Sequence, residues 1–326
     1  MSSTSTPKFT RFAWFVLGYN LLVIMWGAFV RATGSGAGCG NHWPLCNGEV
    51  VPRPESVETM IEFSHRLTSG LDGFLVLGLL IAAFRTYPKR HRVRLAAVVS
   101  MVFLISEALL GAGLVRFGLV ADNDSIERAY VMAAHLLNTF FLVAALTLTA
   151  AWSGGLSRPR RPLHRQTAWL ALGGILLLLL VSVSGAIAAL GDTLFPAESL
   201  REGIAQDLSP TAHILVRLRV FHPIIAIGAT LLLGALALKI QRLQPTAAVT
   251  WNCRFFLTMF GIQLGIGFVN LALAAPVWLQ LVHLLAADLV WIGWILLAAS
   301  ALAAELPATA AAPATSREPL AGVPAR

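Results

Sequence analysis

The sequence Ile61-Glu62-Phe63-Ser64-His65-Arg66 stands where a polar stretch gives way to a long apolar one. It places a carboxylate about one helical turn ahead of a histidine, at the start of a segment long enough to cross a bilayer. Ionisable side chains at such a depth are costly and are usually functional. A second interpretation of Glu62 is local, because Thr59-x-x-Glu62 has the spacing of a capping box that only stabilises a helix start.

The composition around this stretch is that of a membrane protein. Hydrophobic residues make up 57% of the 326 residues and charged residues 12%, with a mean hydropathy of +0.73. Roughly a quarter of the residues in a soluble domain are charged, so an ordinary soluble fold is excluded. The net charge of +8 does not indicate nucleic-acid binding, because Lys and Arg occur in short clusters between apolar segments and form no continuous basic face.

The apolar segments predict an all-α integral membrane protein with eight transmembrane helices. They cover about residues 12–30, 61–84, 95–117, 129–152, 168–190, 214–238, 253–274 and 277–303. No small-residue cleavage site follows the first segment, so we expect a retained helix and not a removed signal peptide.

Charge predicts the orientation of these helices. Most Lys and Arg lie near the termini or in even-numbered loops, and most Asp and Glu lie in odd-numbered loops. The positive-inside rule therefore places both termini in the cytoplasm. We expect residues 1–11 to form a flexible cytoplasmic N-terminus, residues 153–167 a cytoplasmic linker, and residues 304–326, rich in Ala, Pro and Thr, a disordered cytoplasmic tail.

An internal repeat relates the two halves of the chain. The dipeptide Gly-Ala at 27–28 precedes His65, and the same dipeptide at 185–186 precedes His222, at almost the same spacing. This similarity predicts two pseudo-symmetric four-helix bundles in tandem. They would span residues 12–152 and 168–303.

A second pair of segments extends the repeat. Residues 110–115, Leu-Gly-Ala-Gly-Leu-Val, match residues 264–269, Leu-Gly-Ile-Gly-Phe-Val, and each segment is followed by His-Leu-Leu, at His135 and at His283. Each predicted bundle therefore carries two histidines, both on helices that run inward from the outside.

Two imidazoles at similar depth in a helical bundle can ligate a haem iron from both faces. A single histidine in an apolar helix is more often a hydrogen-bonded core residue, but four at repeat-related positions favour ligands. The chain thus offers two bis-histidine haem sites, formed by His65 with His135 and by His222 with His283. Zinc or copper fits less well, because neither pair has a neighbouring thiolate or a third strong ligand.

Arginines near the outer mouths of the bundles are candidates for haem propionate contacts. They are Arg66, Arg128, Arg217 and Arg219. Snorkelling of long basic side chains to the membrane interface explains their positions equally well. Four other histidines, at positions 42, 91, 164 and 213, are assigned no role.

The two halves differ at the position one turn before the first histidine. The first half has Glu62-x-x-His65 and the second has Arg219-x-x-His222, so a cation replaces the carboxylate. This difference predicts one reactive site and one electron-carrying or structural site. Pro223 directly follows His222 and leaves the geometry of that helix open, since proline removes a backbone hydrogen bond.

The first outer loop carries Cys39 and Cys46, which face the oxidising side and can form a structural disulfide or a redox pair. The glycine-rich residues 31–39 lack the GK[ST] ending of a phosphate-binding loop, so a nucleotide site is not expected. The glycines instead let the backbone pass close over the bundle. Cys253 is expected to be inert.

In these residues and their spacing, the chain resembles the haem A synthase family, whose members convert haem O to haem A for cytochrome oxidase. The resemblance covers residues 12–303, and its most specific segments are residues 27–36, 43–46 and 62–66. It implies eight helices in two pseudo-symmetric bundles and a multi-pass protein of the bacterial inner (cell) membrane. The cysteine pair resembles that of one bacterial branch of the family.

The resemblance also implies roles for the singled-out residues. His65 and His135 would ligate the iron of the substrate haem, and His222 and His283 that of a haem b cofactor. Glu62 would be the catalytic acid. The implied reaction oxidises the C8 methyl group of haem O to a formyl group through a hydroxymethyl intermediate, which makes the enzyme an oxidoreductase acting on a CH group.

The implied partners are haem O, haem O synthase (protohaem farnesyltransferase), the assembly of cytochrome oxidase and membrane lipid. A di-haem bis-histidine electron-transfer cytochrome is the main alternative, because it would use all four histidines without altering a haem. A transporter is disfavoured, since four-helix repeats are parallel and not inverted.

Overall fold

The computed structural model describes residues 6–53, 56–156 and 164–303. In these ranges the chain forms ten α-helices and one short 3-10 helix. In chain order they are α1 (Pro7–Ala32), η1 (Ser35–Ala37), α2 (Val57–Thr86), α3 (Arg92–Arg116), α4 (Ile126–Ser153), α5 (Arg165–Leu194), α6 (Leu200–Asp207), α7 (Ile214–Arg219), α8 (Phe221–Leu243), α9 (Ala247–Ala272) and α10 (Val277–Ala303). The expectations for residues 1–5, 157–163 and 304–326 lie outside the described residues.

Eight helical segments in the described ranges are long and apolar enough to cross a membrane, with α7 and α8 counted as one span. The predictions of an all-α fold and of eight spans are thus confirmed. Most helices extend beyond the apolar segments, because capping residues and not hydropathy set their starts. Ser125 accepts a hydrogen bond from the Arg128 amide at the start of α4, and Thr246 accepts one from Val249 at the start of α9.

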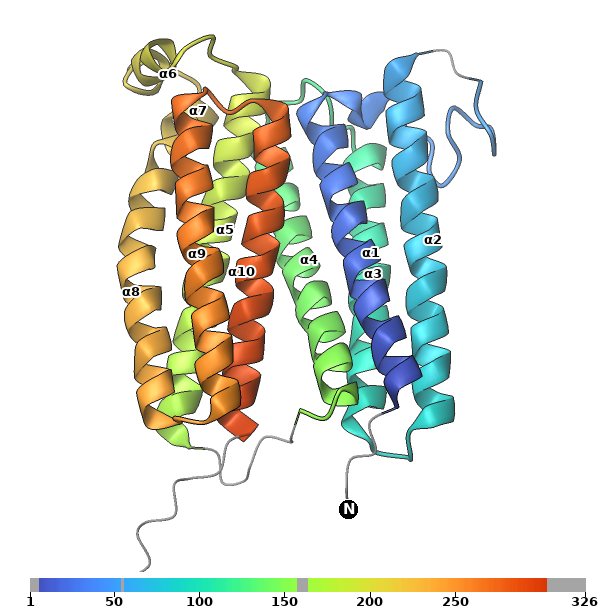
Figure 1. The fold of residues 1–326 in the computed structure, drawn as a ribbon. Coiled ribbons are helices and arrows are strands. Elements are labelled where there is room, and N and C mark those ends of the chain that lie inside the picture. Colours follow the sequence, from blue (N-terminus) through green and yellow to red (C-terminus); the bar gives the residue numbers. More distant parts are fainter. Residues whose placement is uncertain (1–5, 54–55, 157–163, 304–326) are drawn as a thin grey trace, which may run out of the picture.

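The long helices stand side by side in two groups (Figure 1), and the contacts between helices close each group into a ring. The helices α1, α2, α3 and α4 contact one another in that cyclic order, and α5, α8, α9 and α10 do the same. Contacts of α10 with α4 and α1, and of α4 with α5, join the two rings. We call α1–α4 the N-terminal set and α5 with α7–α10 the C-terminal set.

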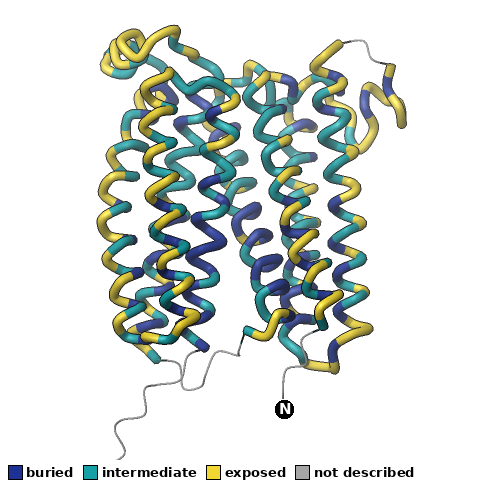
Figure 2. The backbone as a smooth tube through the Cα atoms, viewed as in Figure 1, coloured by how far each residue is buried: buried dark blue, intermediate teal, exposed yellow. Residues whose placement is uncertain are grey.

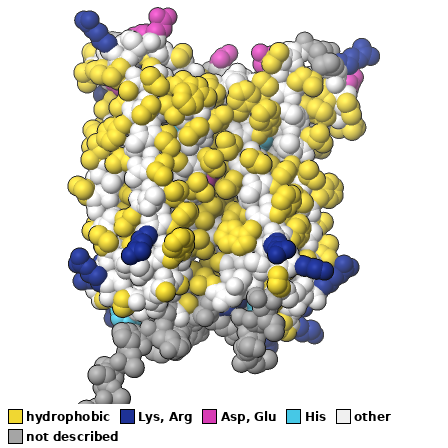
Figure 3. Space-filling view, in the orientation of Figure 1, with side chains coloured by type: hydrophobic (Ala, Val, Ile, Leu, Met, Phe, Trp, Pro, Cys, Tyr) yellow, Lys and Arg dark blue, Asp and Glu magenta, His cyan; other side chains and the backbone are white. Residues whose placement is uncertain are grey.

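Side chains on the surface are sorted by type along the helices (Figure 3). An apolar belt covers the middle of the visible face, and many Lys and Arg side chains gather at the end from which the N-terminus emerges. Most of the visible Asp and Glu side chains lie toward the opposite end, which carries η1 and α6 and is here called the outer end. This distribution agrees with the predicted orientation, which stays a prediction.

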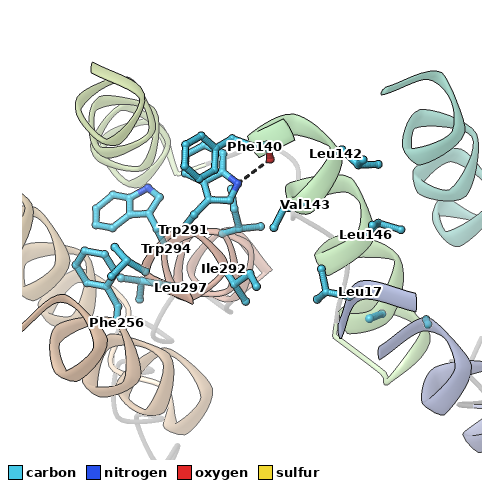
Figure 4. Packing of buried hydrophobic residues seen from close by; sticks show 14 of the residues in the cluster. Leu17, Phe140, Leu142, Val143, Leu146, Phe256, Trp291, Ile292, Trp294 and Leu297 are labelled. Carbon is cyan, nitrogen blue, oxygen red and sulfur yellow. Dashed lines mark hydrogen bonds between the residues drawn. The ribbon is translucent and has the colours of Figure 1, made fainter. Parts of the chain in front are cut away.

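The larger of two hydrophobic clusters in the described residues runs through both sets. Burial is densest along α4 and α10, the helices through which the two rings meet (Figure 2). Leu17 of α1, Val143 of α4 and Phe256 of α9 belong to one buried cluster with Trp291 of α10. Figure 4 shows Trp291 reaching α4, where its Nε1 donates a hydrogen bond to the Phe140 carbonyl at 2.7 Å. The two sets therefore share their packing.

Arg31 joins the two sets at the outer end. From the end of α1, its Nη1 donates to the Ala189 carbonyl of α5 at 2.7 Å and to the Thr193 hydroxyl. Its Nη2 donates to Oε1 of Gln280 in α10 at 2.9 Å. The sequence analysis gave this arginine no role, because its partners lie more than 150 residues away in the chain.

The loop between α5 and α7 and the sixth span differ from expectation. The loop contains the short helix α6, whose start is capped by Ser199 accepting from the Glu202 amide. The spacing Ser199-x-x-Glu202 in the sequence is that of a capping box, which predicts the start of a helix. The sixth span is broken at Val220, between α7 and α8. Pro223 has no amide hydrogen for the carbonyl four residues earlier, at Arg219, which explains the break.

Gly174 of α5 lets α10 approach unusually closely. A Cβ atom at this position would lie 1.7 Å from Cζ2 of Trp294, whose side chain is fully buried. Nε1 of Trp294 donates to the Ala171 carbonyl of α5 at 3.1 Å, and its ring packs edge-on against Phe256. The indole ring is thus held on three sides and has little room to move.

We therefore expect Gly174→Ala to destabilise the protein by about 1–3 kcal/mol, because the core must be overpacked. Thermal unfolding of the detergent-purified protein measures this effect. Gly173→Ala is the matched control, since nothing lies within 4 Å of a Cβ atom there. Equal melting temperatures for the two variants would contradict the proposed contact.

Candidate functional site

Each of the four histidines proposed as ligands lies against a glycine of a neighbouring helix. A Cβ atom at Gly27 of α1 would lie 2.9 Å from Cε1 of His65 in α2. A Cβ atom at Gly185 of α5 would lie 2.9 Å from Cε1 of His222 in α8. Any side chain at either glycine would have to displace an imidazole, so the predicted match between these two helix pairs has a physical basis.

The other two histidines also lie beside a glycine of a neighbouring helix, but one of these glycines is not the residue that the sequence match predicted. A Cβ atom at Gly111 of α3 would lie 3.9 Å from His135, and one at Gly267 of α9 would lie 3.1 Å from His283. Nothing lies within 4 Å of such an atom at Gly265, which the sequence match had paired with Gly111. The match was wrong by two residues, because small and apolar residues in membrane helices align well in several registers.

The two C-terminal histidines face each other across a gap. The ring centroids of His222 and His283 lie 6.5 Å apart, with ring planes at 84°. An imidazole nitrogen binds a metal ion at about 2.0–2.1 Å. Two metal–nitrogen bonds of this length, added to the distance from each nitrogen to the centre of its ring, give a separation of this size. Nδ1 of His222 lies 3.0 Å from the Ser184 hydroxyl, so its Nε2 is available to a ligand.

The N-terminal pair also offers imidazole nitrogens in a buried setting. Nδ1 of His65 is buried without a hydrogen-bond partner among the described residues. Nδ1 of His135 lies 3.4 Å from Oε1 of Glu107 in α3, and the two histidines lie within electrostatic range of each other. In the described ranges, no three or more His, Cys, Asp or Glu side chains group as a metal-ion site. Two-imidazole sites of this kind fit a haem iron, whose porphyrin supplies the remaining ligands.

Glu62 does not cap its helix, contrary to the local interpretation. The cap of α2 is Ser56, whose hydroxyl accepts from the Thr59 amide, and Glu62 lies in the second turn. The Glu62 side chain is 4% exposed. Its Oε2 accepts a hydrogen bond from the Cys39 amide at 2.8 Å, and its Oε1 accepts from Nη2 of Arg66 at 2.5 Å. The carboxylate is thus buried between the first outer loop and the helix that carries His65.

The first outer loop is folded tightly onto the start of α2. Cys39 and Cys46 form a disulfide, which confirms that bonding prediction. A Cβ atom at Gly38 would lie 2.4 Å from the Glu58 backbone, so the predicted close passage of this loop is confirmed at that glycine. Arg66 ties the loop further, because its Nη1 donates to the carbonyls of His42 and Leu45, both at 2.6 Å.

The four arginines predicted to contact propionates have different surroundings. The donors of Arg66 are directed to Glu62 and the first outer loop, as described above. Arg128 is 3% exposed, and its Nη1 donates to the carbonyls of Ala121 and Asn123. Arg217 is exposed on α7. Propionate contact by these residues stays a prediction.

Arg219 has the largest set of partners among them. Its Nε donates to Asp207, and its Nη1 donates to Asp192 at 3.3 Å and to the Phe195 carbonyl at 3.2 Å. Its Nη2 donates to Gln206 at 3.1 Å. The cation that replaces Glu62 in the second half thus holds the loop between α5 and α7, including α6, in place.

Three of the histidines without an assigned role cap helices. Nδ1 of His91 accepts from the Val93 amide at α3, that of His164 from Thr167 at α5, and that of His213 from Leu215 at α7. The sequence analysis missed three acidic residues within the spans, Glu107, Asp72 and Asp288. Asp72 accepts from Asn20 at 2.6 Å, and Asp288 is 1% exposed. An acid inside an apolar helix was the signal that could have identified all three.

Comparison with known proteins identifies the family. The model of the cytochrome oxidase assembly protein family, COX15-CtaA, matches residues 10–295. The chain belongs to this family. Two relatives from strains of Thermus thermophilus, named protohaem IX farnesyltransferase, are 48% identical over 301 residues, or 91% of this chain. The chain spans about half of their length, 49%.

A second group of relatives carries the name haem A synthase. The Bacillus cereus and Bacillus anthracis proteins are 51% identical over 98 residues, which cover 30% of this chain and 32% of each relative. Together with the family match, they confirm the resemblance to the haem A synthase family.

The glycine contacts make a prediction for this family member. We expect Gly185→Ala to weaken haem binding by the His222 pair about tenfold or more, because overpacking costs about 1–3 kcal/mol at the ring. Absorption spectra of the purified protein give the haem-to-protein ratio. Gly228→Ala in α8 is the matched control, since a Cβ atom there meets nothing within 4 Å. Unchanged haem content in both variants would show that the close approach is irrelevant to ligation.

Proposed function

We propose that this family member is a haem A synthase, which oxidises the C8 methyl group of haem O to a formyl group. The observation that supports this most strongly is the arrangement of the four histidines. Each lies against a glycine at the outer part of its helix, and the C-terminal pair stands at a separation that suits a bis-imidazole iron. The names of the Bacillus relatives point to the same activity.

In this proposal the two helix sets act as separate haem-binding units. His65 and His135 hold the substrate haem O in residues 12–152, and His222 and His283 hold haem b in residues 168–303. Haem iron supplies the redox chemistry when bound. The shared core and Arg31 keep the two units in a fixed relation, which is required if electrons pass between them.

Glu62 is proposed to act on the methyl group that is oxidised. Its carboxylate is buried and oriented by the Cys39 amide and by Arg66. A fixed negative charge in a site of low dielectric stabilises positive charge that develops on the methyl carbon, or it accepts the proton that leaves. Each oxidation would remove two electrons and two protons and add the oxygen of a water molecule, with the electrons passing to an acceptor outside this chain. The first would give a hydroxymethyl group, and the second a hydrated aldehyde that loses water to leave the formyl group.

The disulfide loop has a direct part in this arrangement. Cys39 bonds covalently to Cys46 and also donates its amide hydrogen to Glu62. We propose that the disulfide is a structural clamp that keeps the carboxylate at one position relative to His65. It lies on the outer side of a bacterial inner membrane, with both termini in the cytoplasm.

The proposed partner is haem O synthase, the farnesyltransferase that makes the substrate. The Thermus relatives carry that enzyme's name and are about twice as long as the aligned segment. A chain that joins both activities would deliver haem O directly from one to the other. The product, haem A, would then serve the assembly of cytochrome oxidase.

The deciding experiment for the function is to extract the haems from the purified protein and separate them chromatographically. We expect haem O or haem A together with haem B. Haem B alone would instead support the di-haem electron carrier, which uses the same four histidines without changing a haem.

A second experiment tests Glu62. We expect Glu62→Gln to retain both haems and to lower the yield of haem A about 100-fold or more, because the amide keeps the hydrogen bond from Cys39 but carries no negative charge. Haem A formed in membranes supplied with haem O measures this effect. Glu58→Gln, at an exposed acid one turn earlier on α2, is the matched control. Normal haem A formation by Glu62→Gln would leave this carboxylate with only its role in holding the loop.

A further inference from the structure

Glu107 lies in α3, inside a predicted membrane span, and its carboxylate contacts α4. Its Oε1 lies 3.4 Å from Nδ1 of His135 and accepts a hydrogen bond from the Thr139 hydroxyl. Its Oε2 accepts from Nδ2 of Asn138 at 2.5 Å. The carboxylate is therefore held beside the ring nitrogen of His135 that faces away from the ligand position of Nε2.

The groups that hold Glu107 are themselves fixed. Asn138 is 9% exposed, and it also donates to the Phe103 carbonyl at 2.8 Å and accepts from the Ser106 hydroxyl at 2.6 Å. Thr139 is 6% exposed and bonds to the His135 carbonyl at 2.9 Å. Nδ1 of His135 makes no other hydrogen bond within the described residues, and the Glu107 carboxylate is held 3.4 Å from it by two residues of α4.

The equivalent position in the C-terminal set carries a neutral residue. Glu107 precedes the glycine behind His135 by four residues, and Gln263 precedes Gly267 by the same number. The side-chain amide of Gln263 lies 3.2 Å from Nε2 of His283. The two sites thus differ in charge and in geometry at this position, because Glu107 lies beside Nδ1 of His135 whereas Gln263 lies beside Nε2 of His283.

We propose that Glu107 is a positioning residue that makes His135 a stronger electron donor to the substrate haem iron. This inference rests on the proposed function. A ligand histidine that donates its other N–H to a carboxylate is oriented and gains basicity, and such partners change affinity 10–100-fold. Stronger axial donation stabilises ferric iron and lowers the reduction potential. The N-terminal site, where oxidation takes place, therefore holds its iron at a lower potential than it would beside a neutral amide.

The first test is Glu107→Gln, measured by spectroelectrochemical titration of the purified protein loaded with haem O. We expect the potential of the haem O iron to rise by about 59 mV or more, which corresponds to a tenfold change in the ratio of ferric to ferrous affinity. The potential of the second haem should not move. Ser100→Ala, also in α3, is the matched control, because its hydroxyl bonds to the Ala96 carbonyl of its own helix and not to the residues that hold Glu107.

A second variant, Glu107→Asp, keeps the negative charge and draws the carboxylate back from Nδ1 of His135 by one methylene. We expect it to raise the haem O potential by a smaller amount and to leave that of the second haem unchanged. This variant decides the question if Glu107→Gln does not fold, since it retains a carboxylate in α3.

The outcomes separate this inference from the function on which it rests. Uptake of haem O with potentials unchanged in both variants would overturn the inference and reduce Glu107 to a link between two helices. Failure of the unaltered protein to take up haem O would overturn the proposed function and this inference together. Upward shifts of the haem O potential in both variants, with Ser100→Ala unchanged, support the assignment.

Discussion

The close approach of a histidine ring to a glycine on the next helix is the contact on which the site depends. It is tight at His65, His222 and His283, where a Cβ atom on the glycine would lie 2.9–3.1 Å from the ring, and it is an ordinary contact of 3.9 Å at His135. The tight contacts fix both the separation of two helices and the position of an imidazole between them. Because a membrane offers no hydrophobic drive between helices, small residues that permit close packing determine where they meet. The same glycines that draw the helices together thus hold the four imidazoles at defined depths.

Against this common frame, the differences between the two sets are differences of charge. Beside the second histidine, Glu107 in the N-terminal set corresponds to Gln263 in the C-terminal set. Before the first histidine, Glu62 corresponds to Arg219, and each is held by its own outer loop. The sequence repeat accounts for the likeness of the sets, and under the proposed function these differences in charge would distinguish the haem to be modified from the haem to be retained.

The outer loops take part in the site and do not merely cover it. Glu62 would be an unpaired carboxylate near the membrane without the Cys39 amide and Arg66, and an unpaired buried charge is strongly unfavourable. The disulfide closes the loop that provides that amide. In the second half Asp192 and Asp207 compensate Arg219 in the same manner, through α6 and its neighbouring loop. Loop structure and buried charge therefore depend on each other in both halves.

The sequence by itself determined the number of spans and the all-α class, and it singled out the four histidines and Glu62 as candidates, because hydropathy, charge and residue type are local properties. It could not determine that Ser56 and not Thr59 caps α2, that α7 and α8 are separate, or that Gly111 corresponds to Gly267. These three features depend on which face of one helix packs against another helix, and apolar membrane segments can be aligned with each other in several registers. Only the tertiary structure brought Glu107 beside His135 and Arg31 across to α5 and α10, because such contacts join residues that are far apart in the chain.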